Sequence, residues 1–291
     1  MVYLYGMLMP VFYIFSFVIG AIIGSFLNVV ILRYNTGRSP LKGHSFCFFC
    51  SKPLAWWELV PVLSFLVLKG RCFSCRGKIS FQYIVVELLT AGLFTLVAWR
   101  IGMPESLLEV FALLAAWTTV SLLLVISLYD LRHHIIPDSF AYAFAFFGLL
   151  TTLFLSYDST TLGNSILLSL AAGFVYFLPF YLLWKLSEGQ WMGLGDGKLA
   201  IGIGTLLGFS GALSALLFAF WIATLFSLAL LFSQRLRPRR FFSLWHNRST
   251  LTMKSEIPFG PFLALATMIV FLFQIDAIES IGSLLSVFPF F

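Results

Sequence analysis

Residues 191–198 read WMGLGDGK and lie between two long apolar runs of the chain. This position places Asp196 at or inside the edge of a membrane, where an ionisable side chain is costly unless it has a function. The three glycines around it permit backbone conformations that other residues avoid, and they let a substrate chain come close. A second acidic stretch, residues 128–138, reads LYDLRHHIIPD and has the same kind of position. We therefore interpret Asp130 and Asp196 as a catalytic pair of carboxylates at one membrane face.

Composition places the chain among polytopic membrane proteins. Its 291 residues are 60% hydrophobic and only 10% charged, whereas soluble domains have about 25% charged residues. The apolar runs are continuous and about 20 residues long, which predicts helices rather than a barrel. The first run lacks a basic leader and is too long for a cleavable signal peptide. The fold class predicted is all-α, with about eight transmembrane helices at residues 10–32, 82–101, 107–129, 139–156, 165–186, 198–209, 211–233 and 258–280.

The sixth predicted span, residues 198–209, is short and rich in glycine. Helix backbones approach each other closely where side chains are absent. Gly202, Gly204 and Gly208 therefore indicate either close helix packing or a partly re-entrant element.

Charge asymmetry orients these helices. With both termini on one side, 17 of the 18 Lys and Arg side chains fall on one face, and Arg100 alone falls on the other. The positive-inside rule makes the basic face cytoplasmic. The same face holds both aspartates, which were not used to build the topology. This asymmetry accounts for the net charge of +6, so we predict no nucleic-acid partner, and we expect the basic segment 234–257 to rest against anionic membrane lipids.

The one sizeable polar loop, residues 33–81 between the first and second spans, is too small to bury much of a core and needs a staple. It contains every cysteine of the chain, as two CxxC pairs: Cys47, Cys50, Cys72 and Cys75. Two such pairs are typical of a tetrahedral zinc site, and a closed shell of four thiolates has a structural role. Disulfides are the main alternative, which the reducing cytoplasm disfavours. Redox chemistry or an empty site remain open.

Two neighbouring carboxylates can hydrolyse a peptide bond without a metal or a nucleophilic side chain. Because both cannot easily ionise, one keeps a proton while the other stays charged. The charged group activates water, and the protonated group donates to the carbonyl oxygen or the leaving amine. Alternatively, each aspartate caps a helix or pairs with Arg132 or Lys198. Asp138 is similarly placed to cap the fourth span. Glu87 lies inside the second span and must have a partner, which makes it a secondary functional candidate.

Five short segments follow one another in a characteristic order: residues 24–30 (GSFLNVV), the two CxxC pairs, the Asp130 segment, the Asp196 segment and residues 258–264 (PFGPFLA). In this order they resemble the type IV prepilin leader peptidases, bacterial membrane aspartic proteases of the GxGD type. Two departures stand out. Phe48 replaces a proline that the family often has after the first cysteine, and Gly197 replaces an apolar residue.

The resemblance implies that Asp130 and Asp196 cut basic leaders from prepilins and pseudopilins at the cytoplasmic face of the bacterial inner membrane. It also implies N-methylation of the new N-terminal residue with S-adenosylmethionine, since members without the zinc loop are peptidases only. Three parts are expected: a first transmembrane helix (1–32), a cytoplasmic zinc-binding loop domain (33–81) and a transmembrane aspartic peptidase domain (82–291). Two alternatives remain, a peptidase without methylation and a non-enzymatic scaffold or transporter. A transporter would place its acidic residues near the bilayer midplane.

Overall fold

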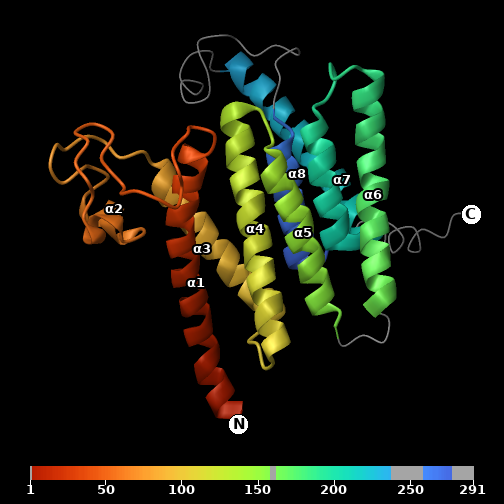
Figure 1. Ribbon diagram of the computed structural model, residues 1–291, viewed down its shortest axis with the longest axis horizontal. Helices are drawn as coiled ribbons and strands as arrows, with labels where there is room; N and C mark the ends of the chain where they lie inside the picture. The colour runs from red at the N-terminus through yellow and green to blue at the C-terminus, as the bar shows by residue number, and fades with distance from the viewer. Residues whose placement is uncertain (1, 158–161, 237–257, 277–291) are drawn as a thin grey trace, which may run out of the picture. The chain divides into compact units, whose positions relative to one another are not determined.

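Figure 1 shows the computed structural model, which describes residues 2–157, 162–236 and 258–276. Over these residues the fold is all-α, and two isolated β-bridges accompany the helices without forming a strand. The elements in chain order are α1 (Val2–Arg33), η1 (Trp56–Leu59), α2 (Leu63–Val67), α3 (Gln82–Ile101), α4 (Leu107–His133), α5 (Asp138–Leu155), α6 (Leu162–Leu186), α7 (Leu194–Leu236) and α8 (Gly260–Phe273).

The predicted fold class is confirmed. Six helices of the described chain are long and apolar enough to cross a membrane, and α8 is a shorter apolar helix. Each of the eight predicted spans is helical over most of its described residues. The sixth and seventh are joined in α7, which is broken at Gly208 (φ 69°, ψ −167°), close to the predicted boundary. The last helix ends earlier than predicted, because Gln274 adopts a left-handed conformation after Phe273.

Two predicted elements lie wholly or partly outside the described residues. They are the end of the last predicted span, 277–280, and nearly all of the basic segment 234–257.

The glycines of α7 have two different roles. A Cβ atom on Gly204 would lie 2.5 Å from the backbone nitrogen of Gly173 in α6, and one on Gly202 would meet the Phe144 ring of α5. Both glycines therefore permit close helix packing, as predicted. Gly208 instead has open space around it, and its positive φ breaks the helix, which only glycine adopts without strain.

The break in α7 leaves backbone groups without their usual helical partners, which is costly in a lipid environment. The Tyr176 hydroxyl of α6 donates a hydrogen bond to the carbonyl of Phe209, at 2.6 Å. The Ser210 hydroxyl also donates to the carboxylate of Asp276, just beyond α8. Neighbouring elements thus stabilise the interrupted helix.

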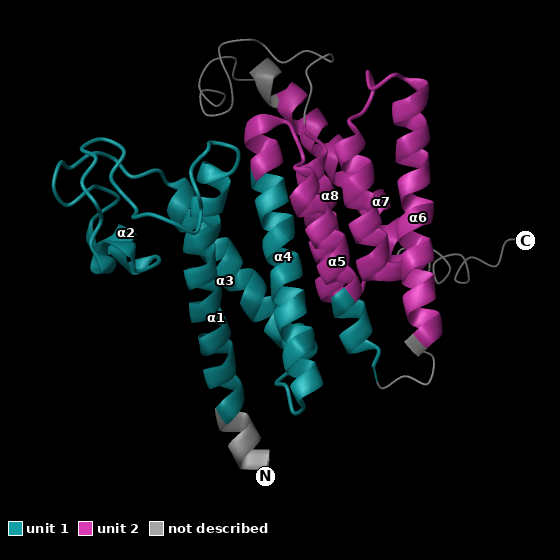
Figure 2. Cartoon of the chain, viewed as in Figure 1, with its two compact units in different colours: residues 1–128, 150–162 teal, residues 129–149, 163–291 magenta. Residues whose placement is uncertain are grey.

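The chain forms two compact units (Figure 2). The first comprises residues 1–128 and 150–162, and the second comprises residues 129–149 and 163–291. The first unit contains the cysteine loop, and the second contains both candidate catalytic aspartates.

In the first unit, α1 packs on α3 through a pair of glycines one helical turn apart. A Cβ atom on Gly20 would lie 2.7 Å from the Cα atom of Ala91, and one on Gly24 would lie 2.8 Å from the Cα atom of Glu87. Small residues spaced in this way let two membrane helices come into backbone contact. This contact fixes the two helices from which the cysteine loop emerges.

We predict that Gly204→Ala destabilises the protein, because the added methyl group would meet backbone rather than a movable side chain. The measurement is the thermal unfolding midpoint in lipid nanodiscs. Gly92→Ala is the matched control, since nothing lies within 4 Å of its added Cβ atom. Alanine at that α3 position should be neutral or stabilise by up to about 1 kcal/mol. Equal midpoints for the two variants would contradict the packing role of Gly204.

Candidate active site

Asp130 lies in the last turn of α4, and the end of that helix sets its position. His134 has a left-handed conformation (φ 53°), and its backbone N–H donates to the carbonyl of Asp130 at 2.8 Å. The chain then turns through Pro137 into α5. The Asp130 side chain is buried, with its residue only 5% exposed. Its carboxylate accepts a hydrogen bond from the backbone N–H of Gly260, the first residue of α8, and interacts electrostatically with His134.

Asp196 is the third residue of α7 and is half-buried. The first turn of a helix has unpaired N–H groups and favours a negative charge. The Asp196 carboxylate interacts electrostatically with that of Asp130. The structure thus brings together two side chains that are 66 positions apart in the sequence, at the C-terminal end of one helix and the N-terminal end of another.

One side chain, Ile136, packs between the two aspartate segments. A Cβ atom on Gly195 would lie 3.0 Å from the Cβ atom of Ile136. A Cβ atom on Gly260 would lie 3.2 Å from the Ile136 Cδ1 atom and 2.5 Å from Asp130 Oδ2. Glycine is therefore required on both sides of the buried isoleucine, and this packing draws the ends of α4, α7 and α8 together.

The glycines around Asp196 differ from what the sequence predicts. Gly195 makes room for Ile136, and Gly197 makes room for α6, since its Cβ atom would lie 3.1 Å from Phe180 Cβ. The unusual Gly197 therefore tightens the start of α7 against α6. Only Gly193 has open space, with no atom nearer than 4.0 Å to its added Cβ atom. A substrate chain would find room at Gly193 alone.

The structure also shows which acidic group pairs with Lys198. Lys198 Nζ lies 2.6 Å from Asp138 Oδ1 and 5.9 Å from the centroid of the Tyr142 ring. Among the described residues, neither candidate aspartate forms a salt bridge. Asp138 and Asp196 both lie in the first turn of a helix, Asp138 as the first residue of α5 and Asp196 as the third residue of α7.

The cysteine loop belongs to the first unit, and its two CxxC pairs adopt the same turn. In each pair the first cysteine donates its N–H to the carbonyl five residues later and accepts from the N–H four residues later. The residue just after each pair, Ser51 or Arg76, has a φ of 57°. The two CxxC motifs of the sequence therefore form one repeated structural turn.

The four cysteines form a set of metal ligands. Their Sγ atoms all lie within 4.8 Å of one another, and those of Cys47 and Cys75 are 3.7 Å apart. Sulfurs bound tetrahedrally at about 2.3 Å from zinc lie about 3.8 Å apart. All four cysteines are free, so the disulfide alternative is not seen. The spacing fits a single tetrahedral ion.

The thiols of the cluster differ in how readily they ionise. The backbone N–H groups of Cys50 and Phe49 lower the pKa of Cys47 to about 7. A backbone hydrogen bond from Gly77 also favours the Cys75 thiolate, but burial and the neighbouring thiols outweigh it and raise the pKa of Cys75 to about 11. Four thiolates this close repel one another, and a divalent cation would offset that repulsion. The residues therefore fit structural zinc.

The sequence predicts that Glu87 needs a partner, because it lies inside a membrane helix. The structure provides one. Its Oε2 atom accepts the backbone N–H of Val62 at 2.8 Å, and its carboxylate also accepts from the Ser25 hydroxyl of α1. Val62 is a β-branched residue with a φ of 62°, a costly conformation that this bond helps to hold. The partner is a backbone group of the cysteine loop, which no sequence motif signals.

Comparisons with known proteins match two parts of the chain. A profile of the bacterial peptidase A24 N-terminal domain matches residues 18–101, and a profile of the type IV leader peptidase family matches residues 117–228. The chain belongs to the type IV leader peptidase family. The second match contains both candidate aspartates, and the first contains all four cysteines.

Curated relatives of this family cover most of the chain. A prepilin leader peptidase/N-methyltransferase of Bacillus subtilis is 32% identical over 88% of this chain and 92% of its own length. One of Aeromonas salmonicida is 32% identical over 88% of this chain and 89% of its length. One of Myxococcus xanthus is 36% identical over 72% of this chain, which spans only 60% of that relative. No solved structure matches the chain.

We predict that the Asp138–Lys198 ion pair positions the start of α7, and with it Asp196. Asp138→Lys and Lys198→Asp should each lower the rate of substrate cleavage, because each places like charges together. The double exchange should restore much of the rate, since it rebuilds the pair in reverse. The measurement is kcat for peptide cleavage in nanodiscs, with thermal unfolding as the control for folding. No recovery in the double variant would contradict the positioning role.

Proposed function

We propose that this protein removes the leader peptide from prepilins and pseudopilins by aspartic peptidase chemistry and then N-methylates the new N-terminus. Membership of the type IV leader peptidase family establishes the enzyme class, and the curated relatives are named prepilin leader peptidase/N-methyltransferase. One observation carries the assignment of residues: two acidic side chains distant in sequence meet at one end of the second unit, around Ile136.

The proposed cleavage uses these two carboxyl groups and a water molecule. Because the charges are close, one carboxyl keeps a proton while the other is ionised. The ionised carboxylate takes a proton from water as the water oxygen attacks the scissile carbonyl carbon. The protonated carboxyl gives its proton to the carbonyl oxygen. The amine then leaves with the proton that the first carboxyl took from water, and the second carboxylate takes back a proton from the diol intermediate. The Gly260 N–H bonded to Asp130 fixes the direction of that carboxylate.

The proposed methylation requires a methyl donor, which S-adenosylmethionine supplies when bound. The four-cysteine set would hold zinc in a structural role, since a closed shell has no position for a substrate. We propose that residues 33–81 act as a zinc-binding domain between residues 1–32 and the peptidase domain of residues 82–291. The non-enzymatic scaffold or transporter is not supported, because the family is one of enzymes.

The protein is a multi-pass membrane protein, as its relatives and the six apolar helices found among its described residues indicate. We place it in the bacterial inner membrane with the aspartates at the cytoplasmic face. This orientation is supported by the distribution of the Lys and Arg side chains.

Asp130→Asn and Asp196→Asn are each predicted to abolish cleavage, because an amide can neither take up nor donate the required proton. A loss of about 100-fold to 10000-fold is expected for a positioned acid or base. Each variant is co-expressed with a candidate prepilin, and the mass of the pilin N-terminus reports cleavage and methylation together. Asp158→Asn, outside both aspartate segments, controls for the substitution itself. Normal processing by either active-site variant would exclude that residue from catalysis.

Cys72→Ser is predicted to remove the bound zinc and to impair methylation more than cleavage. Zinc content per chain, measured by elemental analysis of the purified protein, should fall from about one to near zero, since structural sites need all four ligands. The test for separation is the proportion of cleaved pilin that carries the methyl group. Equal loss of cleavage and methylation would instead show that the loop supports the whole enzyme, and the peptidase-only alternative predicts no methylation even with zinc bound.

A further inference from the structure

The short helix α2 of the cysteine loop is apolar, and most of its side chains are not covered by the rest of the described chain. Four of its five residues are apolar, and none of the five is buried. Its Leu63, Leu66 and Val67 are 62%, 58% and 76% exposed, and Trp56 of the preceding η1 is 81% exposed. By helical spacing Leu63, Leu66 and Val67 share one face of α2, and exposed apolar patches of this kind mark sites of interaction with proteins or membranes.

Contacts to α3 fix the depth at which α2 lies. Val62, directly before α2, bonds through its N–H to Glu87. Glu87 is the sixth residue of α3, about 7.5 Å along the helix from its start. The helix has 20 residues, and about 20 residues are needed to cross the hydrocarbon layer. The start of α2 therefore lies about 7.5 Å inside the end of α3, within the zone of about 5–10 Å in which interfacial segments bury their apolar face.

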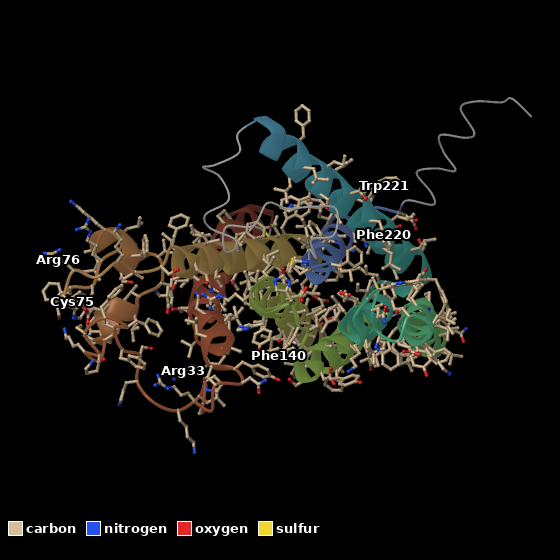
Figure 3. The ribbon with its side chains drawn as sticks, turned by 90° about the horizontal axis from the view of Figure 1, so that it is seen from above. Arg33, Cys75, Arg76, Phe140, Phe220 and Trp221 are labelled. Atoms are coloured by element: carbon tan, nitrogen blue, oxygen red, sulfur yellow. The ribbon has the colours of Figure 1, made fainter. Side chains whose placement is uncertain are left out.

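A second contact and the two views agree with this depth. The Phe65 ring of α2 packs against that of Phe81, just before α3, with centroids 6.2 Å apart. Within the first unit, α2 lies beside the C-terminal half of α1 rather than beyond its end (Figure 1), and the view from above shows the loop displaced sideways, with Cys75 and Arg76 on its outer side (Figure 3). A segment placed beside a membrane helix at this level faces lipid.

The basic charge of the loop favours anionic lipid. Seven basic residues and one acidic residue occur in residues 34–81. The acidic residue, Glu58, is buried, and its carboxylate lies 3.8 Å from Lys52 Nζ. Lys69 and Arg71 follow α2 directly, and both are exposed. Exposed basic groups next to a membrane bind anionic headgroups, at about 1 kcal/mol for each charge.

We propose that this region is a membrane-docking surface that inserts among anionic phospholipids. The α2 surface comprises the apolar side chains Trp56, Leu63, Leu66 and Val67 and the basic side chains Lys69 and Arg71. The apolar residues reach the boundary between headgroups and acyl chains, and the basic residues pair with headgroup phosphates. Aromatic and basic side chains are typical of this interfacial zone. The docking holds the zinc loop against the bilayer, independently of the chemistry assigned to the aspartates.

The test is cross-linking of the full-length protein to a phospholipid that carries a photoreactive acyl chain, in nanodiscs. Adducts are located by mass spectrometry of the digested protein. We expect adducts on α2 and Trp56 in nanodiscs with an anionic lipid, and fewer with zwitterionic lipid alone. Lys69→Gln should lower the α2 adducts by about fivefold in the anionic nanodiscs, from the energy of one headgroup contact. Lys52→Gln changes the net charge by the same amount but should affect the α2 adducts less, because Lys52 Nζ is directed to the carboxylate of Glu58 rather than to headgroups.

Val67→Glu tests the apolar part, with Val67→Leu as the matched control. The first should remove most α2 adducts, whereas the second should keep them. Bound zinc per chain is measured for every variant and should stay unchanged, which separates loss of docking from loss of loop folding. Absence of α2 adducts in the unaltered protein, equal adducts in both lipids, or displacement of the lipid by a prepilin peptide would each overturn the proposal.

Discussion

The contact on which the candidate site depends is the packing of Ile136 against two glycines. A carboxylate pair needs its members within reach of one water molecule, yet Asp130 and Asp196 come from different helices. Ile136 follows Asp130 by six residues and touches Gly195, the neighbour of Asp196. Because glycine has no side chain, the isoleucine fills the gap between the helix ends. The GxGD pattern thus encodes a packing requirement as well as an acidic group.

In the first unit, one contact of Glu87 likewise has two roles. Glu87 is an acidic residue in a membrane helix, and such a group is tolerated only when its carboxylate is bonded. Its bond to the Val62 N–H both satisfies the carboxylate and holds the loop in a conformation that valine otherwise avoids. The close approach of Gly24 to Glu87 in the α1–α3 contact supports this arrangement. The loop is thereby fixed to α3 at Val62, which lies in the sequence between the two cysteine pairs that staple it.

Much of this architecture can be predicted from the sequence, because its strongest signals are local. Long apolar runs predict the helices, paired CxxC motifs predict the thiolate cluster, and the joint position of the two aspartates follows from counting spans. What cannot be predicted depends on contacts between distant segments. The sequence offers three glycines around Asp196 as room for substrate, yet only Gly193 has that room. The pairing of Lys198 with Asp138 rather than Asp196, and of Glu87 with a backbone N–H, likewise depends on packing.

The size of the cysteine loop explains why it needs several different restraints. A segment of about 50 residues cannot bury enough apolar surface to offset the entropy of ordering its chain. Four thiolates around one ion would fix only the two turns at residues 47–50 and 72–75, which leaves the apolar residues between them without a core. In water those side chains would favour collapse or aggregation, whereas beside a bilayer they can be buried in an apolar environment. The proposed docking would explain the exposure of α2, because the bilayer would cover side chains that the loop itself does not bury.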